Sequence, residues 1–420
     1  MRRGLFFYGW VVVGITFLAI LISAGVRSIS GVVMIPLEEE FTWSRSAISL
    51  TFAINLILYG FTGPFVAAAM ERFGIRRIML YAMLLLLLGM GSSLVMTQIW
   101  HFHLFWGVLV GLGTGSFTIL SATVANRWFD KRRGLVMGIL TSASAAGQLI
   151  FLPALSVVVA HSSWRIAVLV FVALEVILIP FILLWMRDRP EEKGLLPYGA
   201  TAPTAAPPST QKKDPVSAAF SVLGLGMRSV PFWLLALSFF ICGMTTNGLI
   251  GTHFIPASAH HGMPAVQAAN LLAFMGVFNI VGTMLSGWLS DRFDPRWLLF
   301  WFYGLRGISL LFLPYTLDNR SFPILLLFAI FYGLDWIATV PPTVRLASEH
   351  FGREQGTVIY GWIFAAHQLG SGAAAFAAGY IYDHFNNYSL TFLSAGVLCL
   401  IATLFVLSVK KQPQPVKQAA

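Results

Sequence analysis

The chain has 420 residues, of which 57% are hydrophobic and 10% charged. Soluble domains carry about a quarter charged residues, so this composition excludes an ordinary soluble protein and indicates one embedded in lipid. The formal net charge of +10 would also suit a nucleic-acid partner, so the positions of the charges must decide between these classes.

Twelve stretches are long and apolar enough to cross a bilayer, which requires about 20 residues. Lipid offers the backbone no hydrogen bonds, and no stretch alternates with the period of two typical of a membrane barrel, so these stretches must be helices. The first could be taken for a signal peptide, but its apolar run is too long and lacks a small-residue cleavage site. The predicted spans are Tyr8–Ile35, Ser46–Met70, Ile78–Met96, His103–Ala125, Leu135–Val159, Ala167–Met186, Val230–Phe254, Val266–Leu289, Leu298–Tyr315, Phe322–Leu346, Thr357–Tyr382 and Tyr388–Val409.

A polar segment in the middle of the chain separates two apolar halves of six spans each. Residues 187–228 are rich in Pro, Ala, Thr and charges, a composition that cannot repay the entropy of ordering. We expect a mostly flexible linker, with a short interfacial helix near Val216–Met227, between residues 1–186 and residues 229–420. The expected fold is an all-α membrane protein with twelve transmembrane helices in two pseudo-symmetric six-helix bundles.

The basic residues are distributed unevenly between the two sides of this topology. Of the 27 lysines and arginines, 22 fall in loops and tails on the side of the termini, and only Arg45, Arg165 and Arg320 fall on the opposite side. Because basic loops stay in the cytoplasm, both termini are predicted to be cytoplasmic in a multi-pass protein of the bacterial inner membrane. The asymmetry explains the net charge without a nucleic-acid partner.

An acid, an arginine and a basic cluster recur after the second span of each half. The first copy is Ala67-Ala-Ala-Met-Glu71-Arg72-Phe-Gly-Ile-Arg76-Arg77, and the second is Gly287-Trp-Leu-Ser-Asp291-Arg292-Phe-Asp294-Pro-Arg296. Such an internal repeat is typical of secondary transporters. It resembles the cytoplasmic loop motif of the major facilitator superfamily, Gly-x-x-x-Asp-Arg-x-Gly-x-Arg-Arg, from which Ala67, Glu71 and Asp294 depart. We predict that the repeat latches helix ends in one conformation, with gating residues Glu71, Arg72, Arg76, Asp291 and Arg292.

Two further motifs resemble the monocarboxylate transporters and their bacterial relatives, including oxalate–formate antiporters. They are Tyr8-Gly9-Trp10 in the first span and Trp128-Phe-Asp-Lys-Arg-Arg-Gly-Leu-Val-Met-Gly138 before the fifth. Arg27-Ser28-Ile29 is also similar to the Lys-Ser-Ile of the animal members, whose lysine is implicated in proton and substrate binding; arginine keeps the charge but cannot release a proton. That family typically carries an Asp and an Arg four apart in span eight, and this chain departs from the pattern with Gly276 and Ile280.

The resemblance implies that spans one, four, seven and ten line a central cavity, which places the mid-span polar residues in context. Arg27 either faces this cavity or extends to the outer surface. Arg306 and Asp335 are expected near the same depth, about 15 Å, where pairing offsets the cost of either charge alone. Glu175 is expected as a buried neutral carboxyl with a local hydrogen bond, with a role in transport as the alternative. The predicted substrate-binding residues are Arg27, Arg306, Asp335, His367, Gln368, Asn247, Tyr332, Asn55 and Tyr59.

Proton coupling is assigned to Asp335 and His367, although a permanent structural ion pair for Asp335 and a merely packed His367 remain open readings. Pro341-Pro342 is expected to break span ten below Asp335, either as a hinge or with its freed carbonyls satisfied by neighbours. Cys242 and Cys399 fall within spans and indicate inert core thiols rather than a disulfide or metal site.

No constellation typical of an enzyme occurs in the sequence: there is no phosphate-binding Gly-x-x-x-x-Gly-Lys-Ser/Thr loop and no paired Cys/His spacing for a metal. We therefore expect no enzyme activity, no cofactor and energy from a gradient. The leading hypothesis is a monomeric secondary transporter of a small organic anion, a monocarboxylate or related carboxylate, coupled to protons and working by alternating access in membrane lipid. The alternatives are a proton-driven exporter of drugs or amphiphiles and a non-transporting receptor or scaffold.

The predicted topology can be tested with a reporter enzyme that is active only in the periplasm. Fused after Thr210, in the central polar segment, it should be silent because that segment is expected in the cytoplasm. The same reporter fused within the loop near Arg320 should be active. Activity at Thr210 would overturn both the orientation and the placement of the segment.

Overall fold

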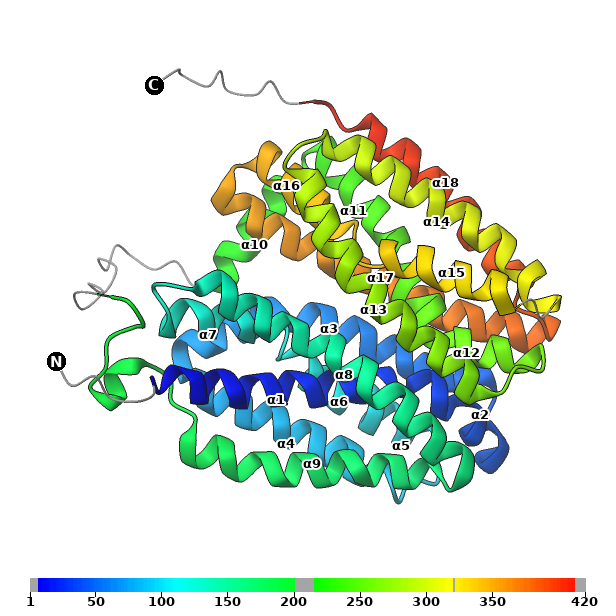
Figure 1. Ribbon diagram of the computed structural model, residues 1–420, viewed down its shortest axis with the longest axis horizontal. Helices are drawn as coiled ribbons and strands as arrows, with labels where there is room; N and C mark the ends of the chain where they lie inside the picture. The colour runs from blue at the N-terminus through cyan, green and yellow to red at the C-terminus, as the bar shows by residue number, and fades with distance from the viewer. Residues whose placement is uncertain (1–6, 201–214, 320–321, 412–420) are drawn as a thin grey trace.

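The computed structural model describes residues 7–200, 215–319 and 322–411 (Figure 1). Within these ranges the backbone is almost entirely helical, and it forms no strand beyond one isolated bridge between Phe129 and Tyr198. The predicted all-α class is therefore confirmed. Several residues that entered the charge count lie outside the described residues: Arg2, Arg3, Lys212, Lys213, Arg320 and Lys417.

The first half of the chain contains α1 (Gly9–Ser28), α2 (Ser30–Phe41), α3 (Arg45–Phe73), α4 (Ile75–Ser93), α5 (Ile99–Phe102), the π-helical turn η1 (His103–Leu109), α6 (Val110–Gly115), α7 (Leu120–Trp128), α8 (Arg133–His161) and α9 (Trp164–Trp185). After the short turn η2 (Pro190–Lys193), the second half contains α10 (Pro215–Met227), α11 (Val230–Gly243), the π-helical turn η3 (Met244–Ile250), α12 (Gly251–His260), α13 (Ala265–Ser290), α14 (Pro295–Asp318), α15 (Phe322–Asp335), α16 (Val340–Phe351), α17 (Arg353–Phe385) and α18 (Ser389–Ser408). Some crossings are assembled from consecutive pieces, such as α11 to α12 and α15 to α16.

Within the described residues, eleven helical stretches are long and apolar enough to cross a membrane. The 33-residue helix α17 is not among these eleven, because His367, Gln368 and a run of Gly and Ala make it less hydrophobic. The start of α1 and the end of α18 nevertheless lie at the same end of the molecule (Figure 1), which requires an even number of crossings between them. Helix α17 is therefore the twelfth crossing, and the two-bundle fold predicted from the sequence is confirmed.

The first predicted span, Tyr8–Ile35, is not one continuous helix. Helix α1 ends at Ser28 and α2 begins at Ser30. The Ser28 hydroxyl donates to the Gly25 carbonyl at 2.8 Å, and the Ser30 hydroxyl donates to the Arg27 carbonyl at 3.1 Å. Such bonds from serine to the preceding turn bend helices, and here they flank the interruption next to Arg27.

Spans four and ten are interrupted at corresponding places. Residues 116–119 separate α6 from α7, and residues 336–339 separate α15 from α16. In each interruption, backbone N–H groups donate hydrogen bonds to the carbonyl three residues earlier. Examples are Phe117 N to Thr114 O and Ala338 N to Asp335 O. The internal repeat therefore extends beyond the loop motif to the backbone geometry of the crossings.

Span ten is interrupted below Asp335, as predicted, but the proline pair follows the interruption and does not form it. Pro341 and Pro342 occupy the first turn of α16, where a missing N–H costs no helical hydrogen bond. The interruption begins directly after Asp335, and the Asn279 side-chain oxygen accepts a hydrogen bond from Ile337 N there at 3.1 Å. The break is thus stabilised from the neighbouring helix α13.

The two bundles are joined at the end of the molecule opposite the termini, which we call the far end. The Asp383 carboxylate of α17 accepts hydrogen bonds from Arg45 N at 3.1 Å and Ser46 N at 2.8 Å, so it caps the N-terminus of α3 across the interface. The Arg45 guanidinium pairs with Glu38 at 2.5 Å and lies 3.7 Å from the Tyr382 ring centroid. Helices α2 and α12 also lie together at this end (Figure 1).

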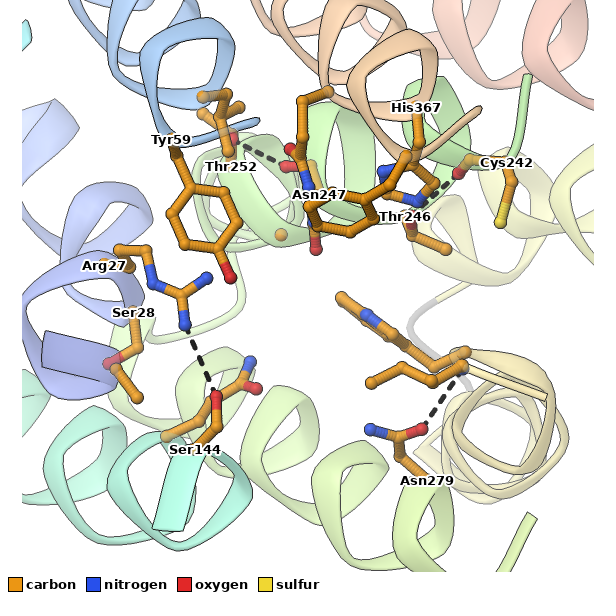
Figure 2. A pocket seen from close by; sticks show the side chains of 18 of the residues that line it. Arg27, Ser28, Tyr59, Ser144, Cys242, Thr246, Asn247, Thr252, Asn279 and His367 are labelled. Atoms are coloured by element: carbon orange, nitrogen blue, oxygen red, sulfur yellow. Dashed lines mark hydrogen bonds between the residues drawn. The ribbon is translucent and has the colours of Figure 1, made fainter. Parts of the chain in front are cut away.

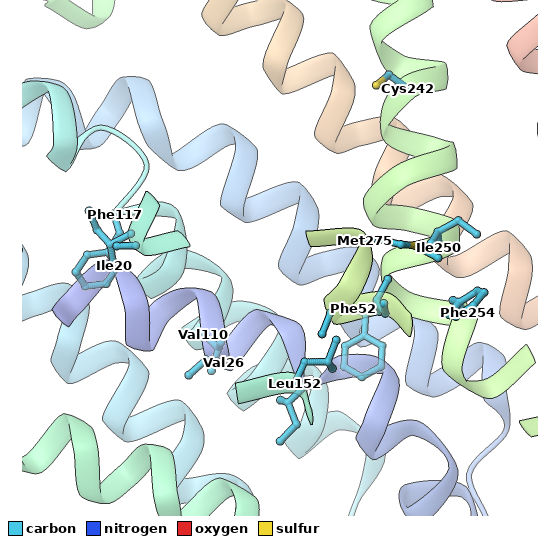
Figure 3. Packing of buried hydrophobic residues seen from close by; sticks show 14 of the residues in the cluster. Ile20, Val26, Phe52, Val110, Phe117, Leu152, Cys242, Ile250, Phe254 and Met275 are labelled. Carbon is cyan, nitrogen blue, oxygen red and sulfur yellow. The ribbon is translucent and has the colours of Figure 1, made fainter. Parts of the chain in front are cut away.

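Apolar packing continues from one bundle into the other. Phe52 of the first bundle and Ile250, Phe254 and Met275 of the second are fully or almost fully buried and belong to one hydrophobic cluster (Figure 3). Because lipid does not drive helices together by the hydrophobic effect, close packing and hydrogen bonds must hold this interface.

Part of the predicted flexible linker is folded onto the first bundle. The Asp188 carboxylate accepts a hydrogen bond from Arg76 N at 2.7 Å, and Tyr198 N donates to Trp128 O at 2.8 Å. The prediction of flexibility is therefore wrong for residues 187–200, because specific side chains anchor that segment. Helix α10 confirms the helix expected near Val216–Met227, residues 201–214 lie outside the described residues, and the exact domain boundaries stay a prediction.

Helix α13 approaches the end of α15 closely at Gly282. A Cβ added to Gly282 would lie 1.8 Å from the Leu334 carbonyl oxygen, whereas a Cβ at Gly276, on the same helix, would meet nothing within 4 Å. The packing of α13 thus requires glycine at position 282 and leaves room for a side chain at position 276.

We expect Gly282→Ala to lower the free energy of unfolding by about 1–3 kcal/mol, because the backbone of α15 must move away. Gly276→Ala is the matched control and should be neutral or slightly stabilising, since alanine favours helix by up to about 1 kcal/mol over glycine. Thermal unfolding of both variants in detergent measures the difference. Equal melting temperatures would contradict the close approach.

Candidate functional site

A cavity of about 230 Å³ lies between the two bundles (Figure 2). It sits on the terminus side of the far-end junction, because its α3 and α17 residues lie about two to five helical turns away from Arg45 and Asp383 along each helix. The first bundle contributes Ala24, Arg27, Ser28, Ser30, Phe52, Asn55, Leu56, Tyr59, Ser144 and Gln148. The second contributes Phe239, Cys242, Thr246, Asn247, Gly251, Thr252, Asn279, Trp336, Ile337, Thr339, Val340, Phe364, His367 and Gln368.

Arg27 lies in the last turn of α1, where the helix dipole favours a cation. Its guanidinium carbon is 4.3 Å from the Tyr59 ring centroid, and one terminal nitrogen is 3.3 Å from the Ser144 hydroxyl (Figure 2). Its Nε atom is buried without a hydrogen-bond partner among the described residues. The side chain therefore lies in the cavity, and the alternative in which it extends to the outer surface does not describe this structure.

His367 and Gln368 lie on the cavity wall formed by α17. The His367 ring is 4.8 Å from the Phe239 ring and 5.8 Å from the nearly parallel Phe364 ring, measured between centroids. His367 is 7% exposed and Gln368 is 1% exposed. His367 Nδ1 and both polar atoms of the Gln368 amide lack a hydrogen-bond partner within the described part of the chain.

Six of the nine predicted substrate-binding residues line this cavity: Arg27, Asn55, Tyr59, Asn247, His367 and Gln368. Asn55 is partly committed elsewhere, because its amide donates to Trp106 O at 2.8 Å. Arg306, Asp335 and Tyr332 do not line the central cavity, since they lie in a layer behind its wall.

The Arg306–Asp335 pair predicted from the sequence is present in that layer. Arg306 Nε lies 2.5 Å from Asp335 Oδ2, and a terminal nitrogen donates to the Asp335 carbonyl at 2.7 Å. The other terminal nitrogen lies 3.0 Å from Cys242 Sγ, and Cys242 itself lines the cavity. Tyr332 donates its hydroxyl to Thr245 O at 2.7 Å. The ion pair is thus separated from the cavity by the Cys242 side chain.

Asp335 also borders a second, mainly apolar cavity of about 200 Å³ between α13, α14 and α15, together with Arg306 and Tyr332. Glu175 is fully buried in α9, but neither carboxyl oxygen has a hydrogen-bond partner among the described residues. The local hydrogen bond predicted for Glu175 is therefore absent from this part of the structure.

Sequence reasoning missed several polar residues of the cavity: Ser144, Gln148, Thr246 and Asn279. Gln148 and Asn279 could have been found from the same signal that identified Arg27, a polar side chain in the middle of an apolar span. Ser144 and Thr246 gave no such signal, because serine and threonine commonly bond their own helix, as Thr246 does to Cys242 O at 2.7 Å.

The repeated loop motif makes contacts within each bundle. Glu71 pairs with Arg127 of α7 at 2.7 Å, and Arg76 donates to the Leu183 carbonyl at the end of α9. In the second copy, Arg296 pairs with Asp294 at 2.7 Å and donates to the Val409 carbonyl at 3.0 Å. Both copies therefore join helix ends of one bundle.

The predicted gating residues Arg72 and Arg292 lie over aromatic rings close to them in the chain, those of Phe73 and Trp288 respectively. No side-chain ion pair involves Asp291 among the described residues. Gating by these residues and by Glu71 and Arg76 stays a prediction.

The second copy of the loop motif has Asp294 at the position where the first copy has Gly74, and the structure explains this difference. Gly74 of the first copy adopts φ of +90°, which favours glycine, whereas Asp294 adopts φ of −64° and caps α14 by accepting from Arg296 N at 3.0 Å. The hydrogen bond from the Arg296 side chain holds the pKa of Asp294 below its usual range. An aspartate therefore replaces the glycine without strain.

The chain matches the family model of the Major Facilitator Superfamily over residues 16–374 and 235–420. It is 26% identical over 389 residues to an uncharacterized MFS-type transporter, YcxA, of Bacillus subtilis (strain 168), covering 91% of this chain and 90% of the relative. It is 25% identical over 399 residues to monocarboxylate transporter 13 of Rattus norvegicus, covering 94% and 87%. The chain belongs to the Major Facilitator Superfamily.

Solved structures show the same fold. A bacterial homologue of the human lysosomal transporter Spinster, in an inward-facing and unoccupied conformation, matches with a TM-score of 0.78 and 16% identity over 96% of this chain and 97% of its own. A D-xylose–proton symporter matches with a TM-score of 0.72 and 17% identity over 96% and 98%. The protein is a multi-pass membrane transporter with a small-molecule substrate, and not an enzyme.

Proposed function

We propose that the protein is a secondary transporter of a small organic anion, a monocarboxylate or a related carboxylate. The observation that carries this proposal is the Arg27 guanidinium in the central cavity. Among the described residues that line the cavity, Arg27 alone has a permanent charge, and none is acidic. Curated relatives named as monocarboxylate transporters support the substrate class.

The geometry of Arg27 suits a carboxylate. A guanidinium can form two parallel hydrogen bonds to the two carboxylate oxygens. Its hydrogen bond to Ser144 is long at 3.3 Å, and its Nε has no partner among the described residues. Binding a carboxylate would therefore satisfy donors that the protein leaves available, with little loss of existing bonds.

Transport would follow from rocking of the two bundles around this cavity. In this conformation, the far end is held closed by the Asp383 cap on α3 and by the contacts of the Arg45 side chain with Glu38 and Tyr382. Alternating access requires these contacts to break while the terminus end closes. With both termini in the cytoplasm of a bacterial cell, the far end would face the periplasm.

Proton coupling is proposed for the Arg306–Asp335 pair and for His367. Arginine stays charged, so within the pair only Asp335 can load and release a proton. A substrate in the cavity cannot reach Arg306 directly, because Cys242 lies between them. Coupling through the pair would thus require Cys242 to move, whereas His367 lies in the cavity wall itself.

The proton-driven exporter of drugs or amphiphiles is the weaker alternative, since no acidic side chain that could bind a cationic drug is found among the described lining residues. A receptor or scaffold would not need a charged cavity between two bundles held at one end. A monomer in the bacterial inner membrane remains part of the proposal.

We expect Arg27→Ala to abolish uptake of carboxylates by proteoliposomes, because the cavity loses the one permanent charge among its described lining residues. Arg27→Lys should bind them at least about tenfold more weakly, since a lysine cannot form the paired hydrogen bonds. Binding is measured by calorimetry on the purified protein. Wild-type affinity in Arg27→Ala would refute carboxylate binding by this residue.

The role of Asp335 is tested with Asp335→Asn, which keeps the shape of the side chain and removes its titration. If Asp335 carries the proton, the variant should exchange substrate across the membrane but not accumulate it when a pH gradient is imposed. The assay uses proteoliposomes with labelled substrate, and His367→Gln is measured in parallel. Accumulation by Asp335→Asn equal to that of the wild type would exclude Asp335 as the proton carrier.

A further inference from the structure

The wall of the central cavity opposite Arg27 carries buried polar atoms without partners. Both amide atoms of Gln368 and the Nδ1 atom of His367 make no hydrogen bond within the described part of the chain. Buried polar groups nearly always have a partner. Several unpaired groups on one cavity wall indicate that a bound molecule supplies the missing bonds.

The packing around these two side chains fixes them in place. A Cβ at Gly60 of α3 would lie 2.4 Å from Gln368 Cβ, so the glycine makes room for the glutamine at the bundle interface. The His367 ring lies against Phe239 and Phe364. Neither side chain can reach a distant partner without disturbing this packing, so the unpaired atoms are a feature of a built site.

Aromatic rings separate this pair from Arg27. Tyr59 lies beside Arg27, and its ring centroid is 6.3 Å from that of Phe364, which is in turn 5.8 Å from that of His367. Figure 2 shows Arg27 and His367 on opposite sides of the cavity. One carboxylate cannot contact both, so a ligand that satisfies both sides has two polar ends and an apolar middle.

We propose that His367 and Gln368 form a second polar subsite that binds a hydroxyl group, and that the substrate is a carboxylate with a hydroxyl at the end remote from it. The inference rests on the proposed function, in which Arg27 binds the carboxylate. A hydroxyl both donates and accepts, as the amide and a neutral imidazole require, whereas a second carboxylate only accepts. The apolar middle of the substrate lies against Tyr59 and Phe364.

The test compares two ligands that differ by one hydroxyl, para-hydroxyphenylacetate and phenylacetate. Calorimetry on the purified wild-type protein should show at least about tenfold tighter binding of the hydroxylated ligand, as expected when a buried site is left unpaired by the analogue. In Gln368→Met the ratio of the two affinities should fall below about threefold. Lactate, whose hydroxyl adjoins its carboxylate, should show no such response to the substitution.

Thr391→Val is the matched control. Thr391 of α18 also has a buried hydroxyl without a partner among the described residues, but it does not line the cavity. The control should keep the wild-type ratio, which separates a ligand contact from a general effect of removing a buried polar group. Thermal unfolding of both variants confirms that they are folded.

Equal affinities of the wild-type protein for the two ligands would overturn this inference. Water alone would then supply the hydrogen bonds of His367 and Gln368. Loss of the ratio in Thr391→Val as well as in Gln368→Met would also overturn it. The proposed function would still stand if Arg27→Ala abolished binding of phenylacetate. If neither aromatic acid nor lactate bound in an Arg27-dependent way, the carboxylate site and the second subsite would both be refuted.

Discussion

Everything in this structure depends on the need of the backbone to bond with itself where lipid surrounds it. Lipid-facing crossings must be continuous helices, and irregular backbone is tolerated only beside a cavity or against other protein. The interruption after Asp335 obeys this constraint. Trp336, Ile337 and Thr339 line the central cavity, and Asn279 accepts the hydrogen bond of Ile337 N. The interruption between α1 and α2 lies between Ser28 and Ser30, which also line it.

A similar need for hydrogen-bond partners applies to charged side chains within the membrane. Arg306 is satisfied from all sides, by Asp335, by the Asp335 carbonyl and by Cys242. Arg27 is not, since it has a long contact to Ser144, an aromatic neighbour and an unpaired Nε. A fully bonded arginine stabilises an arrangement of helices, whereas an incompletely bonded one beside a cavity is available to a ligand. Arg27 and Arg306 thus place the same chemical group in different environments.

Composition and the long apolar stretches were sufficient to predict the all-α class and the two six-helix bundles. The position of Arg27 within a span was sufficient to mark it as a residue that could face a cavity. The breaks were harder, because Pro341 and Pro342 signal an interruption in the sequence but fit within the first turn of a helix. The depths of Arg306 and Asp335 predicted that they pair. The sequence did not reveal which face of its helix each residue occupies, since both crossings are apolar on every face. Asn279 could be recognised as a polar residue within an apolar span, but its bond to Ile337 N requires knowing where α15 ends.

The cap that Asp383 places on α3 joins the bundles through main-chain atoms of Arg45 and Ser46. Every residue except proline offers the same N–H, so substitutions at those two positions leave these particular bonds intact. On the other side of the interface only an acceptor side chain of the right length can take the place of Asp383. The cap is therefore tolerant of genetic drift at Ser46 and sensitive to it at Asp383, whereas Arg45 also contributes its side chain to the closure. A chain-wide mutational scan of transport would display this asymmetry.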